Sequence, residues 1–237
     1  MATVILVRHG KSTANSGGVL AGRAAGVKLD ETGRTQAERA GARLAGVPLS
    51  AVVTSPLERC RQTARVLATA RPEPVDLRVE KALTECDYGD WQGRAIKDLA
   101  KEPLWKVVQA QPSAAAFPGG ESLQAMQARA VAAVRRIDAS IEAADGADAV
   151  WVAVSHGDPI KSILADALGM HLDLFQRLHV DPASISIIRY TGTRPFVLAT
   201  NTHDGDLSWL APRPKRRRTR RPVEDAVVGG GAGPEDH

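Results

Sequence analysis

Short apolar runs alternate along this chain with longer segments in which apolar residues recur at three- and four-residue spacing. The runs are rich in β-branched residues and predict buried strands over residues 3–7, 51–54, 75–79 and 149–154. The helical spacing predicts helices over residues 32–44, 121–144 and 157–168. Strands that alternate with helices predict a three-layer α/β/α fold, doubly wound around a mostly parallel sheet.

Other segments complete the predicted domain, which covers residues 1–210. Ser55, Pro56 and Glu58 occupy the N-cap, N1 and N3 positions of a capping box and predict a further helix start. Residues 91–118 are irregular and interrupted by prolines, whereas residues 185–190 and 195–200 predict a late pair of strands.

Charge is distributed unevenly along the 237 residues, which carry 31 Lys and Arg against 27 Asp and Glu. Residues 211–237 hold seven of the basic and four of the acidic residues, so the body is almost neutral, with 24 against 23. This last segment is rich in Pro and Arg and then in Gly, and we expect it to be a disordered tail. The net charge of +4 therefore describes mainly the tail.

Composition excludes several classes of protein. No apolar run approaches the ~18 residues of a membrane span, and the N-terminal segment lacks the basic region of a signal peptide. Two cysteines, Cys60 and Cys86, make neither a disulfide framework nor a four-ligand zinc site. We expect a cytoplasmic protein with no membrane partner. The excess of 23 Arg over 8 Lys, with abundant Ala, indicates a GC-rich bacterial genome.

Two predicted strands end in histidine. The first strand is followed by Arg8, His9 and Gly10, and the fourth by His156 and Gly157. Ligands of open α/β sheets bind at the carboxyl ends of the strands. If these strands are neighbours, both imidazoles lie in one crevice beside the Arg8 guanidinium.

Five segments, in this order along the chain, carry a resemblance to a known family: Arg8-His9-Gly10-Lys11-Ser12 with Asn15, Ser55 to Ala64, Leu83-Thr84-Glu85 with Gly89, Trp91 and Gly93, Pro118-Gly119-Gly120-Glu121-Ser122, and Val154-Ser155-His156-Gly157. They resemble the histidine phosphatase superfamily in its phosphoglycerate-mutase-like branch, and the whole is similar to actinobacterial phosphatase-like members. The resemblance covers roughly residues 3–200.

The resemblance implies roles that physical chemistry supports. His9 is the expected nucleophile, because a neutral imidazole can form a covalent phosphohistidine. Arg8 and Arg59 are the expected phosphate ligands, since guanidinium forks match phosphoryl oxygens. Asn15 and His156 complete the cradle, and the Gly157 N–H faces the anion from a helix N-terminus. This chemistry needs no metal and no cofactor, and the sequence offers no metal-ligand motif.

Glu85 is the expected general acid and then general base. A structural ion pair with an arginine is the alternative for this residue, while Asp87 and Asp90 are interpreted as solvated loop acids. Asp158 is interpreted as a cap of the following helix.

The remaining histidines and the cysteines receive structural interpretations. His171, His179 and His203 are expected outside the chemistry. Cys60 and Cys86 directly follow Arg59 and Glu85, so a redox switch is one hypothesis and a pair of buried thiols the other.

The segment 91–118 is expected to cover the site and contact the organic part of the substrate. Mutases of the family have an adjacent arginine pair there, whereas this segment has only Arg94. Its apolar residues either line the site or form ordinary core: Trp91, Leu104, Trp105, Val107, Val108 and Phe117. Ala21, where many phosphatase relatives have a polar side chain, leaves less specific recognition of the ester. The sequence thus favours hydrolysis of a small phosphorylated metabolite, with phosphoglycerate mutase or another phosphomutase as the alternative.

A function of another class starts from the tail. Its basic stretch, residues 214–222, would bind nucleic acid or another anionic surface through charge alone, because no aromatic residue lies between the arginines. A solvated extension without partners is the competing interpretation. By analogy with the family, we also expect a homodimer.

Overall fold

Within residues 2–207 and 210, which the computed structural model describes, six strands form one sheet in the order β3-β2-β4-β1-β5-β6. The strands are β1 (Thr3–Arg8), β2 (Ala51–Thr54), β3 (Asp76–Val79), β4 (Val150–Ser155), β5 (Ile185–Arg189) and β6 (Phe196–Thr202). The first four run parallel, whereas β5 is antiparallel to both β1 and β6. The predicted mostly parallel sheet and the late strand pair are confirmed.

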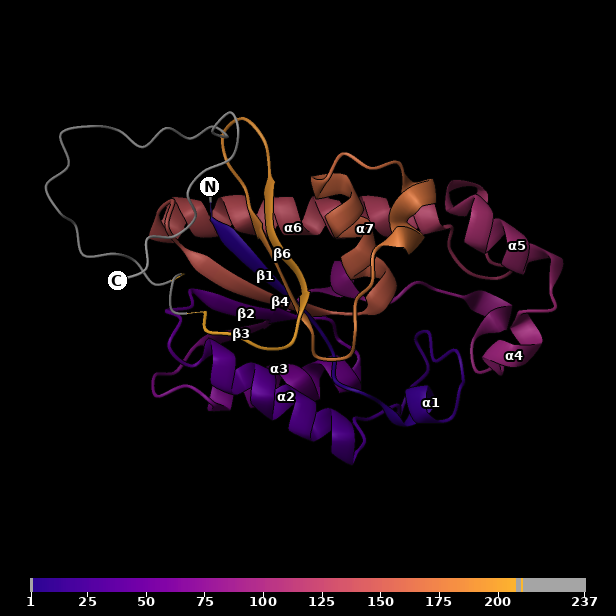
Figure 1. Ribbon diagram of the computed structural model, residues 1–237, viewed down its shortest axis with the longest axis horizontal. Coiled ribbons are helices and arrows are strands. Elements are labelled where there is room, and N and C mark those ends of the chain that lie inside the picture. Colours follow the sequence, from indigo (N-terminus) through magenta and orange to yellow (C-terminus); the bar gives the residue numbers. More distant parts are fainter. Residues whose placement is uncertain (1, 208–209, 211–237) are drawn as a thin grey trace, which may run out of the picture.

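Helices cover both faces of this sheet (Figure 1). They are α1 (Thr13–Ser16), α2 (Glu31–Leu44), α3 (Glu58–Thr69), α4 (Ile96–Leu99), α5 (Pro103–Ala110), α6 (Leu123–Asp145) and α7 (Gly157–Ala167), with short 3-10 turns η1 (Lys81–Leu83), η2 (Gly89–Trp91), η3 (Pro112–Ala114) and η4 (Leu172–Arg177). α2 and α3 lie against one face, and α6 and α7 lie against the other (Figure 1). The predicted three-layer arrangement is therefore confirmed.

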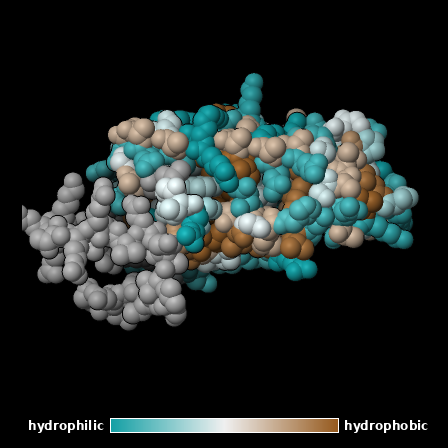
Figure 2. Space-filling view, turned by 90° about the horizontal axis from the view of Figure 1, so that it is seen from above, coloured by the Kyte–Doolittle hydropathy of each residue, from teal (hydrophilic) through white to brown (hydrophobic). Residues whose placement is uncertain are grey.

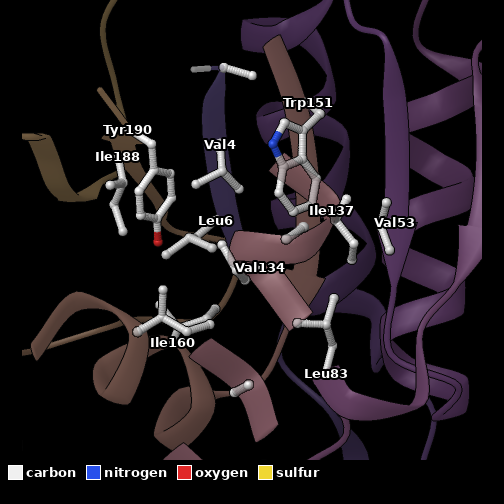
Figure 3. Close-up of a cluster of buried hydrophobic side chains, with 14 of the residues drawn as sticks. Val4, Leu6, Val53, Leu83, Val134, Ile137, Trp151, Ile160, Ile188 and Tyr190 are labelled. Atoms are coloured by element: carbon white, nitrogen blue, oxygen red, sulfur yellow. The ribbon is translucent and has the colours of Figure 1, made fainter. Parts of the chain in front are cut away.

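The alternation of side chains along β1 explains why both faces are covered. Successive strand residues point to opposite faces, so Ile5 packs with α2 and α3 while Val4 and Leu6 pack with α6 and α7. Figure 3 shows Val4 and Leu6 in the apolar cluster between the sheet and helices α6 and α7, near Trp151 of β4. Burying an aliphatic side chain of this size stabilises a fold by about 1.5–3 kcal/mol.

A third apolar cluster lies beyond the sheet, where α4 and α5 pack (Figure 1). Trp91 and Phe117 are buried in it, and Trp105 stacks on Trp91 with ring centroids 6.2 Å apart. On the face seen in Figure 2, hydrophobic residues form separate patches between polar ones. No helix in the described part of the chain is long and apolar enough to cross a membrane.

Two predicted helix starts differ from the structure. The capping box at Ser55 is wrong, because α3 begins at Glu58 with Leu57 as its N-cap and has no side-chain cap. The Ser55 hydroxyl instead lies 2.8 Å from Nε2 of His156, which takes it away from the helix. α6 begins after Ser122, whose side chain accepts from the Ala125 N–H. The predicted tail, residues 211–237, lies outside the described residues.

The register of the sheet brings the strand ends together. Arg8 of β1 pairs with Ser155 of β4, and Thr54 of β2 pairs with Val154. The residues that follow these strands therefore meet at one edge. His9 and His156 lie there with ring centroids 5.2 Å apart, as their positions after neighbouring strands predict.

Candidate active site

A cavity of about 280 Å³ opens at the carboxyl ends of β1 and β4. Six of the residues predicted for the site line it, namely Arg8, His9, Asn15, Arg59, Glu85 and Gly157. They come from segments that are widely separated in the sequence. The fold thus gathers the predicted constellation around one space.

The hydrogen bonds of His9 define its tautomer. Nδ1 lies 2.7 Å from the carbonyl oxygen of Gly10 and donates to it, while Nε2 accepts from Arg59 Nε at 3.1 Å. Burial lowers the pKa of His9 well below its ordinary value, and the Arg59 and Arg8 guanidiniums lower it further. The ring is therefore neutral, with its lone pair on the nitrogen beside Arg59.

Gly10 holds His9 in place through close backbone packing. Its N–H donates to Thr63 Oγ1 at 3.1 Å, and a Cβ at this position would lie 2.2 Å from the carbonyl oxygen of Gly33. A side chain would force the end of β1 away from the first turn of α2. Only glycine permits this approach.

Arg8 and Arg59 each keep a buried guanidinium nitrogen without a partner. Arg59 is 2% exposed and donates through Nη2 to the Gly22 carbonyl at 2.8 Å, and Arg8 donates through Nη1 to the Val180 carbonyl at 2.7 Å. Among the described residues, Arg59 Nη1 and Arg8 Nε have no hydrogen-bond partner. Buried donors are normally satisfied, so these two are suited to an anion in the cavity.

Asn15 sits at the end of α1. Its Oδ1 accepts from the N–H of Ser12 at 3.0 Å and from the Ser12 hydroxyl at 2.8 Å. These bonds commit the amide oxygen and leave the amide NH₂ group for a ligand. Gly157 is the first residue of α7, where helix N–H groups are free to face an anion.

His156 lies behind Arg59 and does not line the cavity. Its Nδ1 accepts from Arg59 Nη2 at 3.1 Å, and its Nε2 is 2.8 Å from the Ser55 hydroxyl. Both ring nitrogens are therefore used, one by Arg59 and the other by Ser55 in the turn before α3. The direct contact with phosphate expected for His156 stays a prediction.

Glu85 faces the cavity with a perturbed carboxyl group. Burial raises the pKa of Glu85 to about 7, the Asp158 carboxylate contributes in the same direction, and Arg59 opposes the shift. Oε1 accepts from the Cys86 N–H at 2.9 Å. A carboxyl group with this pKa is suited to donate and accept protons near neutral pH.

Asp158 lies in the first turn of α7, but its carboxylate does not cap the helix. Oδ2 accepts from the Tyr88 hydroxyl at 2.8 Å, and Oδ1 lies 4.0 Å from Lys161 Nζ. All three side chains line the cavity. Asp158 therefore does not have the predicted capping role. Its carboxylate instead raises the pKa of Glu85.

A short backbone ribbon forms the apolar wall of the cavity. The Leu20 N–H donates to the Arg94 carbonyl at 3.0 Å, the Ile96 N–H donates to the Gly18 carbonyl at 3.0 Å, and Val19 pairs with Ala95. The apolar residues on this wall are Val19, Leu20, Ala21 and Ile96.

Of the two interpretations left open for the apolar residues of segment 91–118, the structure favours ordinary core packing for the aromatic ones. Trp91 and Phe117 are buried in the third cluster, and Trp105 packs against it. Within this segment only Ile96 lines the cavity. The role of segment 91–118 as a substrate cover stays a prediction, and Ile96 is its residue in position to contact the substrate.

The sequence analysis gave no role in the site to three polar side chains of the cavity: Tyr88, Lys161 and His179. His179 lines the cavity, and its Nε2 is 2.8 Å from Asp181, so the expectation that it lies outside the chemistry stays a prediction. His171 is exposed and accepts from the Asp173 N–H, outside the cavity lining. Asp87 is paired with Arg23 at 3.0 Å, so it is not simply solvated.

The cysteines are free and buried. Burial raises the pKa of Cys60 to about 12 and raises the pKa of Cys86 as well. Reactive thiols need a lowered pKa and exposure, so the geometry favours the buried-thiol hypothesis. Across the described residues, no group of three or more His, Cys, Asp or Glu side chains has the arrangement of a metal site.

A model of the histidine phosphatase superfamily (branch 1) matches residues 4–203. The chain belongs to this superfamily. The resemblance predicted from the five segments is thereby confirmed, and residues of four of these segments line the cavity.

Curated relatives include both phosphatases and mutases. Phosphoserine phosphatase 1 of Hydrogenobacter thermophilus is 30% identical over 207 residues, which are 85% of this chain and 92% of that protein. A probable phosphoglycerate mutase of Salmonella choleraesuis is 30% identical over 193 residues, 80% and 86% of the two chains. A bifunctional protein of Mycobacterium tuberculosis is 33% identical over 191 residues, 79% of this chain. The chain spans about half the length of this protein.

Solved structures agree with the fold. The structure of a mycobacterial glucosyl-3-phosphoglycerate phosphatase is 28% identical and superposes with a TM-score of 0.74, covering 84% of this chain and 98% of that one. The architecture is thus that of the histidine phosphatases.

Proposed function

We propose that the protein hydrolyses small phosphomonoesters through a covalent phosphohistidine on His9, without a metal. The observation that carries this proposal is the pair of buried, unpartnered donors, Arg59 Nη1 and Arg8 Nε, of two residues that line one cavity with the neutral imidazole of His9. Three equatorial phosphoryl oxygens offer acceptors for these donors. Asn15 and the Gly157 N–H supply further donors from two other segments that line the cavity.

The first step forms the phosphoenzyme. Nε2 of His9 attacks phosphorus, the bond from phosphorus to the alcohol oxygen breaks, and its electron pair stays on that oxygen. Glu85, protonated in part near neutral pH because its pKa is about 7, gives its proton to the departing oxygen.

The second step releases phosphate. The Glu85 carboxylate takes a proton from water while the water oxygen attacks phosphorus. The phosphorus–nitrogen bond breaks, and its electron pair returns to His9 Nε2. The hydrogen bond from Nδ1 to the Gly10 carbonyl keeps the proton on the opposite nitrogen throughout.

A phosphomutase that uses the same phosphohistidine is the second candidate. In phosphoglycerate mutases, an adjacent arginine pair in the segment that corresponds to 91–118 holds the carboxylate of the substrate. Arg94, the single arginine of segment 91–118, pairs with Glu102 instead. This pairing favours hydrolysis.

Hydrolysis of a generic aryl phosphate tests the proposal, with and without a chelator, in the wild type and in His9→Ala. We expect turnover that resists the chelator and disappears in the folded variant. Turnover that survives His9→Ala, or that the chelator removes, contradicts the mechanism. Incubation with phosphoglycerate and its bisphosphate primer then separates mutase from hydrolase.

Three further expectations about location and partners accompany this proposal. The two buried free thiols suit a reducing, cytoplasmic location. A homodimer and binding of nucleic acid through residues 214–222 stay predictions, the latter on a segment outside the described residues.

A further inference from the structure

The backbone carbonyl of Glu85 accepts hydrogen bonds from two arginines of distant segments. Arg23 Nε and Arg129 Nη2 each donate to this oxygen at 3.0 Å. Arg23 belongs to the loop after α1, and Arg129 belongs to α6. Neither side chain lines the cavity, so neither reaches the substrate directly.

Glu121 joins the two arginines. Its Oε1 accepts from Arg23 Nη2 at 2.8 Å and from the Asp87 N–H at 2.9 Å, and its Oε2 accepts from Arg129 Nε at 3.0 Å. Burial alone would raise the pKa of Glu121, but the bonds from Arg129 and the Asp87 N–H hold it below its usual value. The carboxylate therefore stays charged and binds both guanidiniums.

The segment around Glu85 has no regular structure that could fix it. Glu85 lies between the short turns η1 and η2, outside every helix and strand. Arg129 Nη1 also donates to the carbonyls of Ala82 and Thr84, both at 2.7 Å. Side-chain hydrogen bonds thus supply the backbone partners that a sheet or helix would otherwise provide.

Arg23 also connects this segment to the predicted phosphate site. The residue before it, Gly22, accepts from Arg59 Nη2 at 2.8 Å. One loop therefore touches the guanidinium expected to bind phosphate and the backbone of the expected acid. A displacement of this loop changes the position of both groups together.

We propose that Arg23 and Arg129, joined by Glu121, are positioning residues that hold the Glu85 carboxyl group against the departing alcohol oxygen. This proposal rests on the proposed function, because it assumes that Glu85 donates the proton. A carboxyl group displaced by about 1 Å loses much of its effect on the rate.

The test compares esters that differ in their need for an acid. An alkyl phosphate such as glycerol phosphate leaves as a strongly basic alkoxide, whereas para-nitrophenyl phosphate leaves as a stable phenolate. The measured quantity is kcat/KM, which contains only the steps up to departure of the alcohol. The variants are Arg129→Gln and the less buried Arg23→Gln, with Arg135→Gln on the exposed side of α6 as control.

We refer to the hydrogen bonds of Arg23 and Arg129 to the Glu85 carbonyl as the clamp. We expect kcat/KM for the alkyl ester to fall about 10- to 100-fold in Arg23→Gln and in Arg129→Gln, and kcat/KM for the nitrophenyl ester to change by less than about three-fold. Arg135→Gln should change neither. Equal losses on both esters, or no loss on either, overturn the proposal. Arg23→Gln keeps the test decisive if Arg129→Gln does not fold.

A second measurement needs no turnover and therefore separates this proposal from the proposed function. Carbon NMR of the Glu85 carboxyl group follows its titration in each variant. Loss of the clamp exposes the group to water, so its midpoint should move down by about one pH unit or more. An unchanged midpoint in both variants contradicts the clamp, whether or not the wild type hydrolyses either ester.

Discussion

Arg59 Nε lies 3.1 Å from His9 Nε2 and donates to it. A donor on this nitrogen requires its lone pair, so the proton of the ring is on Nδ1, where it meets the Gly10 carbonyl. One guanidinium thus fixes the tautomer and places a positive charge beside the proposed nucleophilic nitrogen. A phosphoryl oxygen that takes the Arg59 donor frees the lone pair for attack.

Arg59→Ala should reduce kcat by about 10³- to 10⁵-fold, the range measured for single arginines in other phosphoryl-transfer enzymes. The loss removes both the donor to phosphate and the donor to His9 Nε2. Steady-state kinetics with an aryl phosphate measures it. Arg61→Ala, on the exposed side of the same helix, is the matched control and should retain activity.

The pH dependence should report the Glu85 carboxyl group. Since Glu85 must be protonated to act as an acid and has a pKa of about 7, kcat/KM for an alkyl phosphate should fall as pH rises through this value. Asp158→Asn removes a negative charge that raises this pKa, so the fall should begin at lower pH.

The matched control for that profile is Asp166→Asn, which lies on the same helix but pairs with Arg135 on the surface. It should leave the profile where it is. An Asp158→Asn profile that coincides with the wild type, or that shifts to higher pH, contradicts the assignment of Asp158.

Glu85→Gln should stabilise the fold at alkaline pH while abolishing proton transfer. The folded pKa is about 7 and lies above that of the unfolded chain, so the wild type loses stability as pH rises between these values. We expect a gain of about 1–3 kcal/mol in the free energy of unfolding at pH ~8.5 and none at pH ~4. Urea unfolding at both pH values measures this gain, and exposed Glu38→Gln serves as control.

Gly10→Ala should lower both stability and activity. The added Cβ would lie 2.2 Å from the Gly33 carbonyl oxygen, so β1 and α2 must separate and His9 must move. Overpacking of this kind costs about 1–3 kcal/mol. Urea denaturation compares this variant with Gly46→Ala, where a Cβ meets nothing within 4 Å. Equal stability of the two variants would show that the contact is not tight.

The sequence could predict the residues of the site that directly follow strands. His9 and His156 need only one inference, that their strands are parallel neighbours, because a single register then sets their distance. Arg59 and Glu85 required the resemblance to a family, since the local pattern around them is that of an ordinary helix start and an ordinary loop.

Other residues could not be predicted because distant partners decide them. Ser55 matches a helix cap locally, but the hydrogen-bond partner it finds is His156, far along the chain. His179 reaches the cavity through the turn between η4 and β5, which Arg8 holds by its bond to the Val180 carbonyl. The sequence alone is compatible with Trp91 facing either a substrate or the core. In the structure Trp91 is buried and stacks on Trp105 of α5, so it belongs to the core.

The backbone ribbon between residues 18–20 and 93–96 lets the apolar wall of the cavity vary independently of the residues at the end of β1. Its pairing uses backbone atoms, so the side chains of Val19 and Ile96 can be exchanged without altering the strand ends that carry His9 and Arg8. Paired libraries at these two positions therefore give a route to new ester preferences on unchanged catalytic groups.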